Sequence, residues 1–349
     1  MSNLERRPDE TWAACETTIE AGAPTPPEIV TAREVPLGGP RAMTVHRTLP
    51  SKQRTMIGAW CFADHYGPSP VSETGGMVVP PHPHTGLQTV SWLFEGEIEH
   101  RDSVGSHAFV RPGELNLMTA GRGISHSEVS TPATTVLHGV QLWVALPEAS
   151  RQTEPFFENH RASRVVVQDA AISVFVGSLA GVGVPATTFT PLVAAEISLP
   201  AGGVVDLPVE PSFEHGVLVD AGPVSVDGIT ATRTELVHLG VGRDTVALRT
   251  GDEPVRLVLI GGEPLGEKIL MWWNFVGRSH DEVVAYRAAW QRESGAAEPD
   301  GSAPAPTDTA ATPAAHPDAR PRFGASDHHF AGSPLPAPVL PGVRLQPRP

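Results

Sequence analysis

Short apolar runs, broken by Gly and Pro, fill the chain from residue 30 to about residue 148. In the segment TVSWLFEGEIEHRDS, residues 89–103, the apolar side chains Val90, Trp92 and Phe94 recur at every second position. A period of two is typical of a β-strand. The Glu-Gly pair that follows interrupts the run before it resumes, which predicts a hairpin. Because no helical period is visible here, spaced strands with turn signals predict a sandwich or barrel.

The same pattern returns between residues 165 and 266, so the two halves predict two similar barrels. We assign residues 30–160 to the first barrel and residues 161–294 to the second. Residues 1–29 are polar and predict a flexible extension. Residues 295–349 are rich in Pro and Ala without a period, which predicts a low-complexity, mostly disordered tail. The predicted fold class is therefore all-β, with few short helices.

One helix is predicted near the end of the second half. Ser279 and Glu282 have the spacing of a capping box. Val283, Ala288 and Trp290 then suggest an amphipathic stripe. The segment before this helix contains aromatic side chains that we expect to pack in the core or between the barrels: Trp272, Trp273 and Phe275.

Composition and charge exclude several classes of protein. The formal net charge of −14 disfavours general nucleic-acid binding and attraction to anionic membranes. Cys15 and Cys61, the two cysteines, form neither a disulfide framework nor a cysteine-type zinc site. No secretory signal is visible, and no run approaches the ~20 apolar residues of a membrane span. We expect a soluble, cytoplasmic protein.

Two pairs of candidate metal ligands stand out. His82 and His84 are two residues apart in a proline-rich, extended segment, so their imidazoles point to the same side. The prolines cannot donate to a sheet, which predicts an edge strand or a strand start. His126 and Glu128 repeat the spacing after a Gly-rich turn. On neighbouring antiparallel strands the two pairs would converge on one ion.

Three imidazoles and one carboxylate suit iron, nickel, copper, manganese or zinc. On an octahedral ion, four protein ligands would leave two positions for water, dioxygen or substrate. The residues alone leave the choice of metal open.

The segments PPHPHTGLQTVSWLFEGEIEHRDSVG (80–105) and RPGELNLMTAGRGISHSE (111–128) resemble the hallmark of the pirin family in the cupin superfamily. ADHYGP (63–68), QLWVALP (141–147) and IGGEPLGEKILMWWNFV (260–276) extend the resemblance, and RFG at 322–324 resembles the end of a pirin chain.

The resemblance implies two cupin barrels (double-stranded β-helix or jelly-roll) face to face, with metal in the N-terminal barrel alone. The implied ligands are His82, His84, His126 and Glu128. The implied cofactor is one divalent transition metal: Fe(II) is the first expectation, and nickel, copper, manganese, cobalt and zinc are alternatives.

Two positions depart from the pattern. Gln88 stands where general cupins place a glutamate ligand and where pirins often carry glutamate, so tuning around the metal could differ. Thr85 stands where many pirins have arginine, which puts substrate selection at the cavity mouth in question.

Other polar side chains have a structural and a functional interpretation. His65 could support the metal site or be structural. His100 and Asp102 continue the alternation, but we interpret them as an exposed polar strand face. His215 and His238 in the second half lack H-x-H partners, which disfavours a second metal.

Arg122, next to the Gly-rich turn, could meet an anionic substrate, but we expect it to pair with an acidic neighbour. His328 and His329 lie in the predicted tail, where only adventitious metal binding is expected.

The resemblance implies two functions. Some pirins are flavonol (quercetin) 2,3-dioxygenases, which open the ring of a phenolic substrate and release carbon monoxide. Glu128 would then act as the catalytic base. Alternatively, pirins serve as metal-dependent, redox-sensing regulators that bind a partner protein, such as a transcriptional co-regulator or a metabolic enzyme. We expect a monomer in either case.

Overall fold

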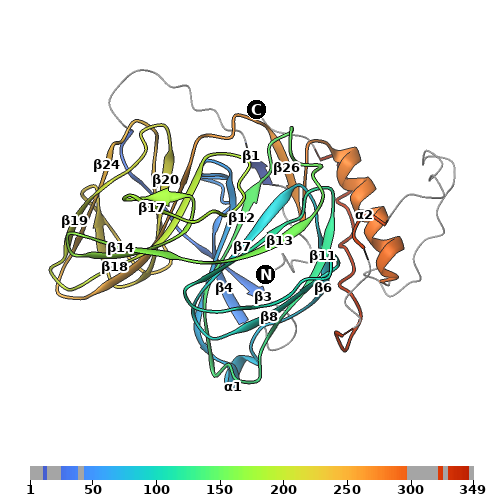
Figure 1. The fold of residues 1–349 in the computed structure, drawn as a ribbon. Coiled ribbons are helices and arrows are strands. Elements are labelled where there is room, and N and C mark those ends of the chain that lie inside the picture. The colour runs from blue at the N-terminus through green and yellow to red at the C-terminus, as the bar shows by residue number, and fades with distance from the viewer. Residues whose placement is uncertain (1–10, 14–24, 38–42, 297–320, 325–328, 346–349) are drawn as a thin grey trace.

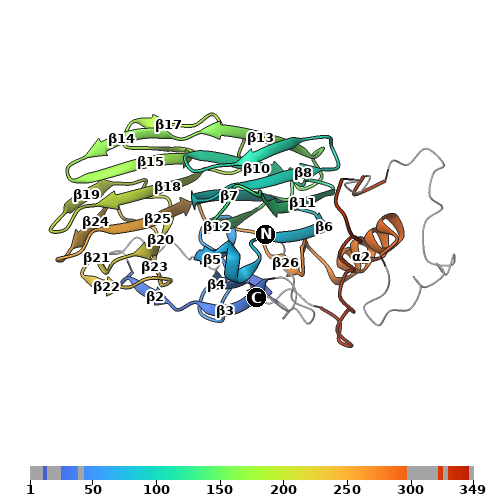
Figure 2. The same ribbon diagram turned by 90° about the horizontal axis from the view of Figure 1, so that it is seen from below.

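The computed structural model describes residues 11–13, 25–37, 43–296, 321–324 and 329–345. Strands dominate these residues, and the named strand pairs are antiparallel. Four of the sheets form two barrels, each made of a seven-stranded and a four-stranded sheet. Figures 1 and 2 show the barrels side by side. The predicted all-β, two-barrel fold is thereby confirmed.

In the first barrel the seven-stranded sheet has the order β13-β10-β7-β12-β5-β4-β3, and the four-stranded sheet has the order β6-β11-β8-β9. The strands of the first barrel are β3 (Arg33–Leu37), β4 (Met43–Leu49), β5 (Trp60–Pro70), β6 (Val78–His84), β7 (Leu87–Glu95), β8 (Ile98–Asp102), β9 (His107–Val110), β10 (Glu114–Thr119), β11 (Ile124–Ser130), β12 (Val136–Ala145) and β13 (Phe156–Arg161).

The second barrel repeats this plan with the sheets β14-β15-β18-β25-β20-β23-β2 and β19-β24-β21-β22. Its strands are β2 (Glu28–Val30), β14 (Ser163–Val167), β15 (Ala170–Val176), β18 (Leu192–Leu199), β19 (Val204–Pro208), β20 (Glu214–Ala221), β21 (Val224–Val226), β22 (Ile229–Ala231), β23 (Leu236–Leu239), β24 (Thr245–Thr250) and β25 (Val255–Gly262). Smaller elements are β1 (Thr11–Ala13), β16 (Ser178–Leu179), β17 (Val182–Gly183), β26 (Ile269–Trp272), β27 (Phe275–Gly277), α1 (Val71–Thr74) and α2 (His280–Ser294).

The two seven-stranded sheets face each other, and their apolar side chains form a shared core. Trp92 and Val140 of the first barrel belong to the same buried cluster as Leu218 and Ile260 of the second. The opposite face of each sheet looks into its own barrel. Strands such as β7 are therefore buried on both faces, and the alternation of polar and apolar residues is only partial in their sequence.

The predicted hairpin around Glu95-Gly96 is wrong, because β7 and β8 belong to different sheets. β7 pairs with β10 and β12, whereas β8 pairs with β11 and β9. The turn carries the chain from one wall of the barrel to the other. A local sequence signal for a turn does not specify which strands pair across it.

The N-terminal segment differs in part from the predicted extension. Residues Thr11–Ala13 form β1, which pairs with β26, and residues Glu28–Val30 form β2. β2 precedes the first barrel in sequence but pairs with β23 of the second barrel. These residues are held by backbone pairing to later parts of the chain. Cys15 lies outside the described residues.

The predicted helix is confirmed as α2. The hydroxyl of its N-cap, Ser279, accepts a hydrogen bond from the Glu282 backbone N–H at 3.3 Å. Val283 and Trp290 are buried as predicted, whereas Ala288 is exposed; the other buried residues of the helix are Tyr286, Ala289 and Gln291. Val283, Tyr286 and Trp290 are separated by three and four residues, a spacing that places them on one face of the helix.

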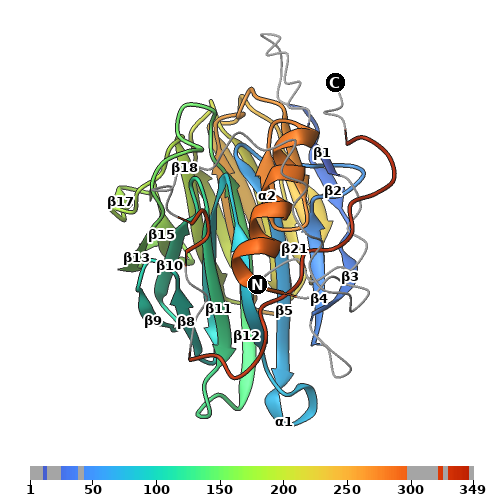
Figure 3. The same ribbon diagram turned by 90° about the vertical axis from the view of Figure 1, so that its right-hand side faces the viewer.

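α2 lies on the side of the first barrel that is remote from the second barrel (Figures 1 and 3). Trp272 and Phe275 pack against this helix together with Phe323, so these aromatic side chains are core residues as predicted, although they do not lie between the barrels. Within the predicted tail, Phe323 and Leu345 are buried, and the Leu335 N–H donates to Pro81 O at 2.9 Å. The tail segments 321–324 and 329–345 therefore pack on the fold, with RFG as an anchored part.

Helices that are both long and apolar enough to cross a membrane are absent from the described residues.

Candidate metal centre

The two predicted ligand pairs lie on adjacent strands. β6 and β11 are antiparallel neighbours, and His126 is directly opposite His82 in their register. β6 is the edge strand of its sheet, as its prolines predict. On the side of β6 away from β11 the described residues include no neighbouring strand, so the missing N–H groups of Pro81 and Pro83 cost no hydrogen bond of the sheet there. A register shift between His126 and Glu128 then redirects the rest of β11.

Two glycines near the ligand pairs, Gly86 and Gly121, allow other segments of the chain to pack closely against the backbone. Gly86 follows the H-x-H segment with φ 68°, and a Cβ there would lie 2.2 Å from Val276 O. Gly121 has φ 50°, and a Cβ there would lie 2.0 Å from Thr153 O. Only glycine fits both the backbone conformation and the space at these two positions.

The imidazoles of His82, His84 and His126 form one buried group. One ring nitrogen of each lies within 4.8 Å of the others. His126 also belongs to a second such group with His100 and Glu128. The structure thus joins three of the predicted ligands in one triad and places the fourth, Glu128, in a second triad that shares His126 and adds His100. All four side chains are at most 1% exposed.

Hydrogen bonding fixes the tautomer of His82. Its Nδ1 lies 2.9 Å from Pro80 O, and a carbonyl can only accept, so Nδ1 carries the proton. Burial lowers the pKa of His82 to about 4, which keeps the ring neutral at pH 7. Nε2 is therefore a lone pair inside the barrel, without a hydrogen-bond partner in the described part of the chain. This is the usual arrangement of a metal-binding imidazole.

Hydrogen bonds through His100 and Asp102 likewise fix the tautomer of His126. The Nε2 of His100 lies 3.3 Å from Asp102 Oδ2, and the Nδ1 of His100 lies 3.3 Å from His126 Nδ1. When neutral His100 donates to the carboxylate, its Nδ1 accepts the proton of His126 Nδ1–H. His126 Nε2 then presents a lone pair toward His84 Nε2 at 3.1 Å. That separation suits two nitrogens that each lie about 2.0–2.1 Å from one ion.

The prediction that His100 and Asp102 form an exposed strand face is wrong. His100 is 4% exposed, its ring stacks on Phe157 with centroids 4.7 Å apart, and the Asp102 side chain is buried. These residues point into the barrel like the ligands. The outer face of β8 carries Glu99 and Arg101 instead, which pair at 2.7 Å.

Burial also favours the neutral form of the other two histidines, His84 and His126. Desolvation, followed by the effect of neighbouring His82, holds the pKa of His84 well below its usual value. The pKa of His126 is lowered well below its usual value by burial first and by His82 and His84 next. Neutral imidazoles are the form that binds a metal.

Gln88 and Thr85, the two residues that depart from the pirin pattern, lie outside the cluster of metal ligands. The Gln88 amide donates to Thr119 Oγ1 at 2.8 Å and to Thr187 O at 2.9 Å, so its side chain faces the second barrel and not the metal ligands. Thr85 is buried beside Phe275, not at an open mouth.

Arg122 pairs with Glu154 at 3.0 Å, as expected. His328 lies outside the described residues.

His65 is not part of the metal centre. Its Nε2 lies 2.6 Å from Asp220 Oδ1, and His138 Nε2 lies 2.5 Å from the same oxygen. Arg256 Nε donates to the other oxygen, Asp220 Oδ2, at 2.5 Å. Because Asp220 and Arg256 belong to the second barrel, this buried cluster is a polar contact between the barrels.

The second barrel brings no comparable set of ligands together among its described residues. His215 is buried with both ring nitrogens lacking hydrogen-bond partners, and His238 Nε2 lies 3.4 Å from Glu214 Oε1. Burial lowers the pKa of His215 to about 4, with a further lowering from Arg243.

This shift predicts a pH-dependent stability. Between pH 6.5 and 4 the unfolded chain protonates His215 and the folded chain does not, so the free energy of unfolding falls as pH falls through this window. At pH 5 the loss from His215 is roughly 2 kcal/mol. Urea unfolding at pH 7 and pH 5 should show a smaller loss for His215→Leu than for the wild type. Equal losses in the two proteins would contradict this assignment.

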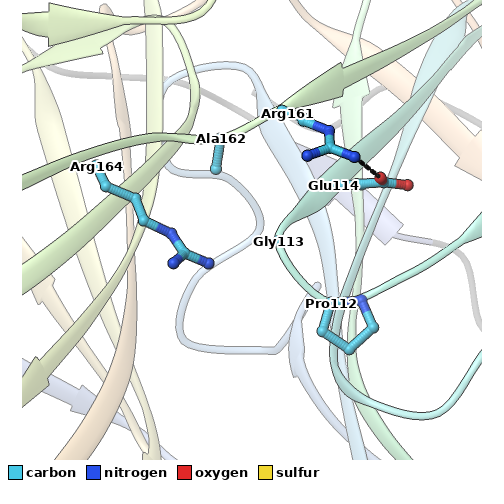
Figure 4. Close-up of a pocket in the computed structure, with 6 residues that line it drawn as sticks. All are labelled: Pro112, Gly113, Glu114, Arg161, Ala162 and Arg164. Carbon is cyan, nitrogen blue, oxygen red and sulfur yellow. Dashed lines mark ion pairs between the residues drawn. The ribbon is translucent and has the colours of Figure 1, made fainter.

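A shallow cavity of about 310 Å³ lies where the chain passes between the barrels. Figure 4 shows Arg161 and Arg164 on its wall, with Gly113 and Glu114 beside them. Arg161 pairs with Glu114 at 3.8 Å. None of the clustered histidines lines this cavity.

Both halves of the chain are similar to known proteins. Residues 42–144 match the pirin family and residues 194–295 match the pirin C-terminal cupin domain. A Pseudomonas aeruginosa protein named "Putative quercetin 2,3-dioxygenase" is 42% identical over 296 residues, which are 83% of this chain and 91% of that protein. A pirin-like protein of Caulobacter vibrioides is 35% identical over 256 residues, 71% of this chain and 88% of that one.

Among solved structures, a crystal structure of quercetin 2,3-dioxygenase from Acinetobacter baumannii superposes with a TM-score of 0.79 at 35% identity. The superposition covers 91% of this chain and 96% of that one. The chain belongs to the pirin family, as a protein of two cupin domains.

Proposed function

We propose that the chain is a metal-dependent dioxygenase of the quercetin 2,3-dioxygenase type, with one divalent transition metal in the first barrel. The observation that carries the proposal is the set of buried imidazoles of His82, His84 and His126 with lowered pKa values, with the carboxylate of Glu128 beside His126. The names of the similar proteins from Pseudomonas aeruginosa and Acinetobacter baumannii support the choice of a small phenolic substrate.

The donor set fits the ion. His82, His84, His126 and Glu128 would hold it, and three imidazoles with one carboxylate match first-row divalent metals, with Fe(II) as our first choice. When bound, such an ion supplies Lewis acidity and a site for exchange of electrons with dioxygen.

The chain's own residues perform the proton chemistry. Glu128 is the only carboxylate among the four proposed ligands, so we assign it the removal of the proton from the substrate hydroxyl. Proton removal leaves an electron-rich enolate, which is the form of a flavonol that reacts with dioxygen. The site is buried, so bulk water does not compete for this proton, and the Glu128 carboxyl group returns it to the product.

The test is metal analysis of the purified protein followed by oxygen uptake with quercetin on the same metal-loaded sample. We expect about one metal ion per chain, and one carbon monoxide released for each dioxygen consumed. Metal at that ratio without oxygen uptake would reject the dioxygenase and favour a metal-dependent partner-binding protein. Absence of metal after reloading would reject the assignment of the four ligands.

Replacement of His100 by alanine should lower the affinity for the metal, although His100 is not one of the proposed ligands. The His100 ring holds the proton of His126 on Nδ1, and loss of such a partner typically lowers metal affinity ~10–100-fold. Competition with a chelator measures the change. His107→Ala is the matched control, because His107 lies 44% exposed on the adjacent strand. Equal affinity in His100→Ala and the wild type would contradict the proposed role.

A further inference from the structure

A continuous row of polar side chains crosses the seven-stranded sheet of the first barrel. Strand register places Asn116 opposite Ser91, Ser91 opposite Gln141, Gln141 opposite Asp64 and Asp64 opposite Arg47. The five residues come from β10, β7, β12, β5 and β4. Each is at most 4% exposed.

The row faces the interior of the first barrel. Side chains two residues apart on a strand share a face, so Gln141 points to the same side as Trp143. The Trp143 ring lies edge-on to His84, with centroids 5.1 Å apart. The alternate residues of β12, Val140 and Leu142, belong to the core between the barrels. The polar row therefore lies across the barrel from the metal ligands.

The oxygens of this row are already engaged. Ser91 Oγ donates to Gln141 Oε1 at 2.9 Å, and Asn159 Nδ2 donates to Asn116 Oδ1 at 2.5 Å. Both carboxylate oxygens of Asp64 accept from Arg47, at 2.7 and 2.8 Å. The carboxamide and carboxylate acceptors of the row are thus used within the protein.

Two donors remain. Gln141 Nε2 and Asn116 Nδ2 are buried and have no hydrogen-bond partner within the described residues. Burial of an amide donor without an acceptor is unfavourable, so two of them on one wall of a barrel point to a ligand that supplies acceptors. The ion pair of Arg47 and Asp64 cancels its own charge, which favours a neutral ligand over an anion.

We propose that the Asn116–Ser91–Gln141 row is the substrate-recognition wall of the first barrel. It takes a small planar molecule whose metal-binding group faces the histidines and whose far edge carries hydroxyl or carbonyl oxygens. Gln141 and Asn116 donate to those oxygens, and Ser91 is a positioning residue that holds the Gln141 amide. The inference rests on the proposed dioxygenase function and defines its substrate class.

The test compares two flavonols that share the 3-hydroxy-4-keto group. Quercetin carries further hydroxyls on its outer rings, and 3-hydroxyflavone carries none. Their affinities for the metal-loaded protein are measured by absorbance under nitrogen, which prevents turnover. We expect the wild type to prefer quercetin. Gln141→Leu and Asn116→Leu should each reduce that preference about tenfold and leave the affinity for 3-hydroxyflavone unchanged.

Gln53→Leu, the same change as Gln141→Leu but at an exposed loop residue, is the control and should keep the wild-type preference. Metal content and thermal unfolding confirm that each variant is folded and loaded. An unchanged preference in both row variants would overturn the recognition wall while leaving the proposed function intact. Absence of flavonol binding by the wild type would overturn the proposed function together with this substrate class.

Discussion

Glu128→Gln should keep the metal and lose most of its oxygen uptake with quercetin. Glutamine retains an oxygen donor at the same place but cannot accept the substrate proton. General bases contribute typically ~10²–10⁴-fold to a rate, and we expect kcat to fall within that range. The measurement is steady-state oxygen consumption per bound metal ion, so that partial loss of metal does not pass for loss of catalysis.

Glu99→Gln is the matched control. Glu99 lies on β8, directly opposite Val129 of β11, and its half-buried side chain faces outward, where it pairs with Arg101. We expect this variant to retain the wild-type rate. A Glu128→Gln protein with full metal content and full activity would rule out the role of Glu128 as base.

Removal of the carboxylate of Asp220 should destabilise the junction between the barrels. Asp220 accepts from His65, His138 and Arg256, and its side chain is 1% exposed. Burial opposes its ionisation, but the hydrogen bonds from His138, His65 and Arg256 outweigh burial and lower its pKa. In Asp220→Ala the buried His65 and His138 and the partly exposed Arg256 lose their acceptor.

Removal of one partner of a buried ion pair lowers the free energy of unfolding by about 3–5 kcal/mol. Because the Arg256 side chain is 31% exposed and can reach water, we expect a loss near 3 kcal/mol. Chemical denaturation measures it. Asp206→Ala removes a surface carboxylate that pairs with Arg249, and should cost at most ~1 kcal/mol. Equal losses in the two variants would show that the Asp220 cluster adds no stability.

The sequence predicts the ligand pairs because their geometry is local. Two residues two apart in an extended segment share a face in any β-fold, so His82 and His84 can be paired without knowledge of the topology. The prolines around them likewise predict an edge strand, and the structure has one. The two-barrel architecture follows from the repeated strands and the resemblance to pirins.

Other features depend on which strands meet, and alternation does not specify that. His100 and Asp102 have the pattern of an exposed face, yet the same pattern fits a strand whose polar side chains point into a barrel. Asn116, Ser91 and Gln141 form a row because the register joins residues far apart in sequence. No single segment carries a signal for that row.

The pairing of β2 with β23 bears on how the chain is made. The ribosome releases β2 before the whole first barrel, but the partner strand of β2 is synthesised only near the end of the second barrel. β2 therefore lacks its partner strand during the whole synthesis of the first barrel. β2 is the edge strand of the seven-stranded sheet of the second barrel, so this sheet is complete only after β23 has been synthesised. A nascent chain that is halted before β23 therefore lacks the strand with which β2 pairs.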